Sequence, residues 1–326
     1  MFRIDLATKL IHFLAVAGLV VATASYAQDY PTRPVRIIVP FAAGGSNDIV
    51  GRMLAQKLSE ALHQQFVVDN RAGAAGNIGT YLAAKAAPDG YTLLSGGMGS
   101  LVANPAISKV PYDTVRDFAP ITLIARAPNV LVLHPSVPAQ NVAQLIALAR
   151  ARPGQLNYGS GGVGSTPHLS GALFAMMAGI ELNHVPYKGA APAVVDLIAG
   201  HVQLVLAGIP IVLPHLSLGK LKAIAVTGLE RSLQLPNIPT VSESGLKGYD
   251  VNPWYGLLAP AGTPIEILSR LHAECRKALT SPAMKEHLLR QGAEADGSAP
   301  AEFAGVIRAD LKKWSDVAQQ ARIRAD

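Results

Sequence analysis

The chain contains very little cysteine, a modest share of charge and few aromatic residues. Cys275 is the single cysteine in 326 residues, which excludes an internal disulfide and a cysteine-based zinc site. Charged residues make up 15% of the chain, and the formal net charge is only +6. Lys and Arg are dispersed, so no basic stripe interleaved with aromatics is available to bind nucleic acid. We therefore expect no nucleic-acid partner.

Apolar runs long enough to cross a bilayer are also missing, because a spanning helix needs roughly 20 apolar residues. The longest run, Leu10–Ala24, follows Arg3 and Lys9 and is followed by Ser25–Ala27, with small residues at the positions that a signal peptidase reads. This pattern predicts a signal peptide over the first 27 residues, cleaved before Gln28. The residue at the cleavage site is Gln28 and not a cysteine, so a lipid-anchored mature form is not expected. Export without disulfides is typical of the bacterial periplasm.

Half of the residues are hydrophobic, and the length suits two domains of ordinary size. Short β-branched runs alternate with Gly-rich turns and helical patterns, which predicts an α/β fold with parallel sheets between layers of helices. Expected strands are 35–39, 66–69, 91–95, 130–133, 156–158, 184–185, 202–206 and 223–227, and expected helices include 48–64, 142–151, 167–178 and 191–199.

The C-terminal third has a different pattern. Pro264–Leu279 and Glu302–Gln320 are amphipathic, with no strand expected between them. We expect these helices to pack back on the first lobe, so that the chain crosses between lobes near Arg126–Asn129 and again near Tyr249–Trp254. The predicted domains are a first lobe of residues 28–127 and 251–326 and a second lobe of residues 128–250.

A Gly-rich turn follows the strand predicted at Val35–Val39. It contains Gly44, Gly45, Ser46, Asn47 and Asp48, and an amphipathic helix starts there. A helix start presents unpaired backbone N–H groups and a partial positive charge, which suits an anion. The turn is therefore a candidate anion site.

The same arrangement returns in the second lobe. Ser160, Gly164, Ser165 and Thr166 lie in the turn Leu156–Thr166, between a predicted strand and a helix. Two such helix starts in one chain predict two lobes that grip one small acid between them. Hydroxyl groups in the second turn would add donors to its backbone N–H groups.

Other interpretations of these motifs find less support. Gly159-x-Gly161-x-x-Gly164 matches a dinucleotide fingerprint, but Glu181 precedes the next strand where the acid should end it. No G-x-S-x-G elbow occurs, so a serine hydrolase is not favoured. His201 and His215 are too far apart for a pair on one helix to bind zinc. We expect no catalytic residue, metal or cofactor.

Several single residues allow two interpretations each. Asp48 either stabilises its helix against the dipole or faces the cleft, where it would orient water or a ligand amine. His168 either points into the cleft or serves in capping and packing. Tyr187 and Lys188 follow a strand end, where open α/β sheets place ligand contacts, although Lys188 also suits the surface. Trp254-Tyr255 either lines the cleft or packs the hinge.

In order along the chain, these motifs resemble the periplasmic solute-binding receptors of tripartite tricarboxylate transporters, also called Bug receptors. The resemblance covers nearly the whole mature chain and rests on Tyr30–Pro34, Val39–Asp48, Asp69–Gly73, Ala87–Tyr91, Pro111–Ile121, Tyr158–Leu169, His184–Gly189, Leu235–Thr240, Trp254–Gly256 and Ala259–Pro264.

The resemblance implies a two-lobed Venus flytrap, each lobe a mostly parallel sheet flanked by helices. It further implies a monomeric receptor that is not an enzyme, binds a small carboxylate through neutral donors and water, and delivers it to integral-membrane transporter subunits. Ligand choice is expected in Gly96–Leu101 and Ala207–Pro210. Two alternatives remain open: an exported α/β enzyme acting on a carboxylate, and a sensor that presents its ligand to a signalling partner. The candidate ligand-binding residues are Gly44, Gly45, Ser46, Asn47, Asp48, Ser160, Gly164, Ser165, Thr166, His168, Tyr187, Ala207 and Gly208.

Overall fold

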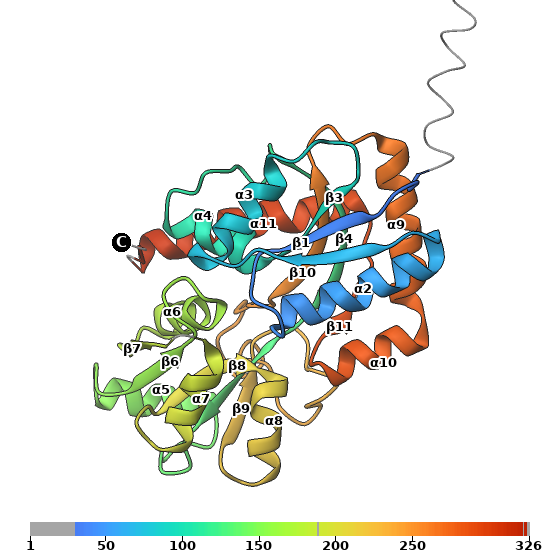
Figure 1. Cartoon of the computed structure of the whole chain (residues 1–326). Helices are drawn as coiled ribbons and strands as arrows, with labels where there is room; N and C mark the ends of the chain where they lie inside the picture. The colour runs from blue at the N-terminus through green and yellow to red at the C-terminus, as the bar shows by residue number, and fades with distance from the viewer. Residues whose placement is uncertain (1–29, 188, 322, 325–326) are drawn as a thin grey trace, which may run out of the picture.

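A computed structural model describes residues 30–187, 189–321 and 323–324 (Figure 1). The predicted signal peptide, its cleavage site and Lys188 lie outside the described residues. Within them the elements are β1 (Val35–Val39), α2 (Ser46–Leu62), β2 (Phe66–Asn70), η1 (Ala74–Gly76), α3 (Asn77–Ala84), β3 (Thr92–Gly97), η2 (Gly99–Ala103), α4 (Asn104–Ile107), β4 (Phe118–Arg126), β5 (Asn129–Leu133), α5 (Val142–Ala151), β6 (Asn157–Ser160), α6 (Thr166–Ala178), β7 (Asn183–Pro186), α7 (Ala190–Ile198), β8 (Leu204–Gly208), α8 (Ile209–Ser217), β9 (Lys222–Val226), β10 (Trp254–Pro260), α9 (Ile265–Thr280), α10 (Pro282–Arg290), β11 (Glu294–Ala295) and α11 (Pro300–Gln320).

The first sheet has the strand order β11-β4-β10-β3-β1-β2 and takes its strands from residues 35–126 and 254–295. Successive side chains of a strand point to opposite faces. Ile37 accordingly joins an apolar cluster with α2 and α9, whereas Ile38 joins a second cluster with η2 and α11. Leu93 and Leu94 of β3 divide in the same way. The sheet is therefore covered by helices on both faces, as α/β architecture requires.

The second sheet has the order β7-β6-β8-β5-β9 and lies wholly within residues 129–226. Its strand β5 is buried along its full length. Val130 and Val132 pack with α7 and α8, and Leu131 and Leu133 face the cluster that includes α5 and α6. The two sheets with their helices form the two-lobed α/β fold that the sequence predicts (Figure 1).

The expectation of mostly parallel sheets is wrong, because both sheets are mixed. β1 is parallel to β2 and β3, but β10 is antiparallel to β3 and β4. In the second sheet β6 is parallel to β7 and β8, whereas β5 is antiparallel to β8 and β9. In the first sheet the cause is the double crossing, because β4 carries the chain out of the first lobe and β10 brings it back alongside in the opposite direction.

The C-terminal region also differs from expectation. Helix α10 and the short strand β11 lie between α9 and α11, where no strand was expected. β11 pairs with β4 through Glu294↔Arg126 and Ala295↔Ala125, which extends the first sheet at its edge. Two residues are too short a run for apolar alternation to reveal a strand.

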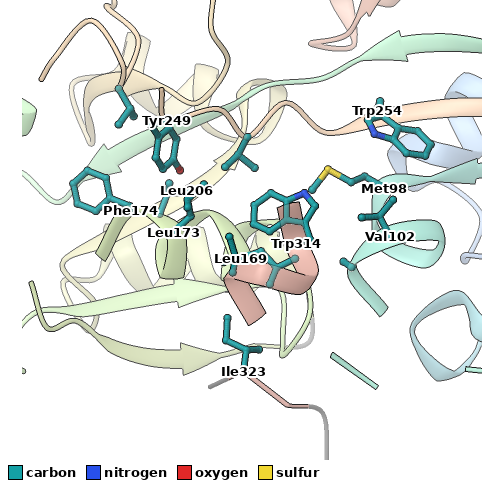
Figure 2. Close-up of a cluster of buried hydrophobic side chains, with 14 of the residues drawn as sticks. Met98, Val102, Leu169, Leu173, Phe174, Leu206, Tyr249, Trp254, Trp314 and Ile323 are labelled. Atoms are coloured by element: carbon teal, nitrogen blue, oxygen red, sulfur yellow. The ribbon is translucent and has the colours of Figure 1, made fainter. Parts of the chain in front are cut away.

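Apolar packing continues from one lobe into the other. Figure 2 shows Trp314 of α11 between Met98 and Val102 of the first lobe and Leu169 of α6 in the second. The Trp314 side chain is fully buried. Helix α11 thus packs on the first sheet and reaches α6 of the second lobe.

Candidate functional site

The two lobes face each other across two adjoining cavities. The turn after β1, the end of β3 and the start of β10 border a cavity of about 270 Å³, here called cavity 1. The turns before α6 and α7 border a cavity of about 330 Å³, here called cavity 2. Phe41, Gly99 and Thr166 line both. Cavity 1 is further lined by Gly45, Ser46, Asn47, Gly97, Met98, Pro253, Trp254 and Tyr255, and cavity 2 by Ala75, Asn104, Gly161, Val163, Gly164, Ser165, Pro167, Gly189 and Ala190.

Helix α2 opens onto cavity 1 with an uncapped N-terminus. Its N-cap, Gly45, has no side chain to accept a hydrogen bond from the first turn. The first helical hydrogen bond joins Ile49 N–H to the Gly45 carbonyl at 3.0 Å. The N–H groups of Ser46, Asn47 and Asp48 precede that bond and have no helical acceptor. This end of the helix therefore offers neutral donors and the positive end of the dipole.

Asp48 faces inward and lines neither cavity. Its carboxylate accepts hydrogen bonds from Gly44 N–H (2.9 Å), Arg52 Nε (3.0 Å) and Asn70 Nδ2 (2.8 Å). Burial opposes ionisation of this carboxyl, but the hydrogen bonds from Arg52, Gly44 and Asn70 outweigh it and hold the pKa below its usual range. Asp48 ties the turn to the helix and to β2, and so sets the shape of the turn.

In the second lobe the turn before α6 is held by its own side chains. Ser165 is the N-cap, and its Oγ accepts from His168 N–H at 3.3 Å. Gly164 N–H donates to His168 Nδ1 at 3.1 Å, and Gly162 N–H donates to Ser160 Oγ at 3.1 Å. Gly164, Ser165 and Thr166 line cavity 2, whereas Ser160 and His168 lie behind the turn and support it.

Two histidines stack behind this turn. The His168 and His184 rings lie 3.9 Å apart between centroids and 13° from parallel. Ser160 Oγ lies 2.6 Å from His184 Nε2. Burial, and then the neighbouring His184, lower the pKa of His168 to about 4. Burial lowers the pKa of His184 as well. The pair is therefore neutral at neutral pH, and His168 Nδ1 can accept from the turn.

The remaining candidates do not line either cavity. The Tyr187 hydroxyl donates to Asp196 Oδ2 at 2.7 Å, and burial followed by this bond raises the pKa of Tyr187 to about 12. Ala207 is fully buried in β8, opposite Val130, and Gly208 lies opposite Asn129. Ala207 and Gly208 thus belong to the sheet where it approaches the crossing between the lobes.

Sequence reasoning missed part of the lining. Phe41, Ala75, Asn104 and Pro253 come from segments far apart in the chain, and none of them was among the predicted site residues. The sequence left two roles open for Trp254-Tyr255, lining the cleft or packing the hinge. In the structure both residues line cavity 1. No described lining residue of either cavity carries a charge. In the part of the chain that the structure describes, no cluster of His, Cys, Asp or Glu is arranged to hold a metal ion.

Comparison with known proteins shows which family this chain belongs to. The sequence matches the family described as the tripartite tricarboxylate transporter family receptor over residues 50–323. The chain belongs to this family. It is 38% identical to protein BugT of Bordetella pertussis over 94% of this chain and 96% of that protein.

Two solved structures are also similar to this receptor. Rpa4515 of R. palustris with adipate shares 40% identity and a TM-score of 0.80, covering 90% of this chain and 99% of that one. MatC of Rhodopseudomonas palustris with bound malate shares 32% identity and a TM-score of 0.76, covering 88% and 99%. The chain is thus a solute-binding receptor by family and by fold. Among the described helices of the receptor, none combines the length and apolar character needed to cross a membrane.

Proposed function

We propose that this receptor captures a small carboxylate between its lobes in the periplasm and delivers it to the membrane subunits of a tripartite tricarboxylate-type transporter. One observation carries the proposal: helix starts from both lobes open on a cleft whose described lining offers neutral donors and no charged side chain. Adipate and malate in two relatives support the ligand class.

An uncharged lining can hold an acid because hydrogen bonds to a charged partner are stronger than neutral ones. Each contributes roughly 1.5–3 kcal/mol, and helix dipoles add to them. We assign direct ligand contact to Gly45, Ser46, Asn47, Gly164, Ser165 and Thr166, all of which line the cavities. Gly44, Asp48, Ser160, His168 and Tyr187 shape the turns.

Several further features belong to this proposal. The first 27 residues direct export and are removed before Gln28. The lobes comprise residues 28–127 with 251–326, and residues 128–250, and they draw together on the ligand. The mature protein acts as a monomer and without catalysis. Ala207 and Gly208 act indirectly, through the strand that approaches the crossing.

The test is calorimetric titration of the purified protein with succinate, malate, adipate, 2-hydroxyadipate and hexanoate. We expect saturable binding of at least one acid, unchanged acid after incubation, and a smaller radius of gyration by solution scattering when it binds. Chemical conversion of the acid would instead support an exported enzyme. Failure of every acid to bind would contradict the proposed ligand class.

A further inference from the structure

We propose that a contact between the lobes outside both cavities, here called the outer clasp, holds the lobes in the binding arrangement and so sets ligand affinity. The outer clasp consists of Pro210 and Gln234 in the second lobe and Leu289 and Gly292 in the first. None of these four residues lines cavity 1 or cavity 2. The inference rests on the proposed function, in which the lobes draw together on an acid, and adds residues that act without touching it.

A hydrogen bond joins the two lobes at the outer clasp. Gln234 Nε2 donates to the Leu289 carbonyl, in the last turn of α10, at 2.6 Å. The same carbonyl accepts from Gly292 N–H at 2.8 Å, so the bond reaches the turn that ends the helix. Beside it, Leu233 N–H donates to Glu294 Oε1 at 3.3 Å. The loop that follows β9 is therefore tied to α10 and β11 of the first lobe.

Close packing at Gly292 forms the rest of the outer clasp. A methyl group placed on Gly292 would lie 2.3 Å from Pro210 Cδ and 2.4 Å from its Cγ. The proline ring is fixed to its own backbone, so it cannot turn aside as a flexible side chain could. Gly292 also has a φ of +69°, which favours glycine. The absence of a side chain therefore lets the start of α8 approach the end of α10.

Each side of the outer clasp is anchored in the core of its own lobe. Leu288 and Ala293, on either side of the turn that ends α10, are buried in the cluster that packs on the first sheet. Ile209 is buried in the cluster of the second sheet, and Leu235 packs against it. The clasp therefore connects two rigid bodies, and a rotation that withdraws Pro210 from Gly292 breaks it.

The outer clasp is only partly satisfied. Gln234 Oε1 is buried and, among the described residues, has no hydrogen-bond partner. Closing the clasp gives the amide nitrogen a hydrogen bond but takes water from the amide oxygen, and a buried acceptor without a partner is unfavourable. The two effects partly offset each other, which suits a contact that forms and breaks as the lobes move.

Loss of the outer clasp lowers affinity through the populations of the two arrangements. An acid that bridges both lobes binds only while they stand together, so its apparent affinity falls with the fraction of molecules in that arrangement. Variants of the clasp remove no contact with the acid. They should therefore weaken different acids by the same factor and leave the order of preference among them unchanged.

Gly292→Ala tests the packing. Its methyl cannot fit against the Pro210 ring, so adipate and malate should each bind roughly tenfold more weakly in calorimetric titration. The unliganded variant should have a larger radius of gyration than the unliganded parent protein in solution scattering. Gly219→Ala is the matched control, because Gly219 has a φ of +66° and no described atom lies within 4 Å of an added methyl. Both variants strain the backbone alike, and only Gly292→Ala should lose affinity.

Two further variants separate the contact between the lobes from local strain. Adding Pro210→Ala to Gly292→Ala removes the ring atoms that the methyl would meet, and should restore affinity to within about threefold of Pro210→Ala alone. Gln234→Glu turns a carboxylate oxygen toward the Leu289 carbonyl and should weaken both acids by about threefold to tenfold. Gln65→Glu introduces the same charge at an exposed glutamine and should weaken neither.

Distinct results overturn distinct claims. Equal adipate affinities or equal radii in Gly292→Ala and Gly219→Ala would overturn the outer clasp. Thermal unfolding identifies any variant that has lost its fold, and if Gly292→Ala does so, unchanged affinity in Gln234→Glu overturns the clasp instead. An unrestored double variant would overturn the role of Pro210. Unequal factors for adipate and malate would show that the variants act on ligand contacts. If no acid binds, succinate and hexanoate included, while the radii still differ, the proposed function fails and the clasp stands.

Discussion

The imidazole rings of His168 and His184 stack 3.9 Å apart, and His168 Nδ1 accepts a hydrogen bond from the Gly164 N–H of the turn before α6. The two residues come from different elements, α6 and β7, so their contact joins a helix start to the sheet behind it. The turn keeps this geometry only while His168 is neutral, because a proton on Nδ1 removes the acceptor.

Stability should therefore fall as the pH drops through the acid range. Above pH 6.5 His168 is neutral in both the folded and the unfolded chain. Between 6.5 and about 4 the unfolded chain binds a proton that the folded one, with its pKa of about 4, does not. The resulting loss of unfolding free energy grows to about 3 kcal/mol as the pH falls to about 4, and below that pH it levels off.

Urea denaturation at several pH values between 7.5 and 4 measures this dependence. His168→Asn keeps an acceptor for Gly164 N–H and should flatten the profile. His287→Asn changes an exposed histidine of α10 and should leave it unchanged. Identical pH profiles for the parent protein and His168→Asn would show that the histidine stack is not the source of the pH dependence of stability.

Thr166 lines both cavities and offers a hydroxyl donor in the second lobe. Thr166→Val keeps the shape and removes the hydroxyl, so affinity for the bound acid should fall by about one to two powers of ten. Ser165→Ala should weaken binding similarly and also remove the cap of α6. Titration of both variants and of Lys188→Ala distinguishes binding through neutral donors from binding through an ion pair. If only the lysine variant loses affinity, an ion pair holds the ligand.

Asp48 should matter for the turn, although it lines neither cavity. Asp48→Asn removes the charge that three donors share, so we expect a loss of about 2 kcal/mol in unfolding free energy, together with weaker ligand binding. Glu60→Gln is the control, because Glu60 forms only exposed contacts on the same helix. Equal unfolding free energies for the two variants would argue against the role of Asp48 in the turn.

Trp314 should contribute strongly to stability because it packs between the lobes (Figure 2). Trp314→Ala should cost about 3–5 kcal/mol in unfolding free energy, as buried aromatic truncations do. Trp314→Phe should cost much less, since the indole Nε1 is buried without a partner among the described residues and its loss is not penalised. Denaturant titration of both variants measures the difference, and equal costs would contradict this account.

Local patterns predicted the strand–turn–helix units well. Helix α5 has the predicted bounds Val142–Ala151, and β1 lies at Val35–Val39. Strand β10 (Trp254–Pro260) was not predicted, and only its first residue lies in the crossing expected near Tyr249–Trp254. Its pairing with β3 and β4 depends on residues more than a hundred positions away.

The sequence predicted site residues only where the residues of a single turn are enough to indicate an anion site. The helix starts at Gly45 and Ser165 were recognisable from their glycine and hydroxyl residues. The inward direction of Asp48 was not, because Asn70 comes from a neighbouring strand. The stack of His168 on His184 could not be predicted either, because the two histidines come together only in the folded chain.

Mass spectrometry of the small molecule released from protein purified without denaturation from the periplasm tests the central claim most directly. The account predicts an unmodified carboxylic acid of low mass, stoichiometric with the protein and lost from Thr166→Val. A bound cation, nucleotide or uncharged solute in its place would contradict the proposal that the cleft holds a carboxylate.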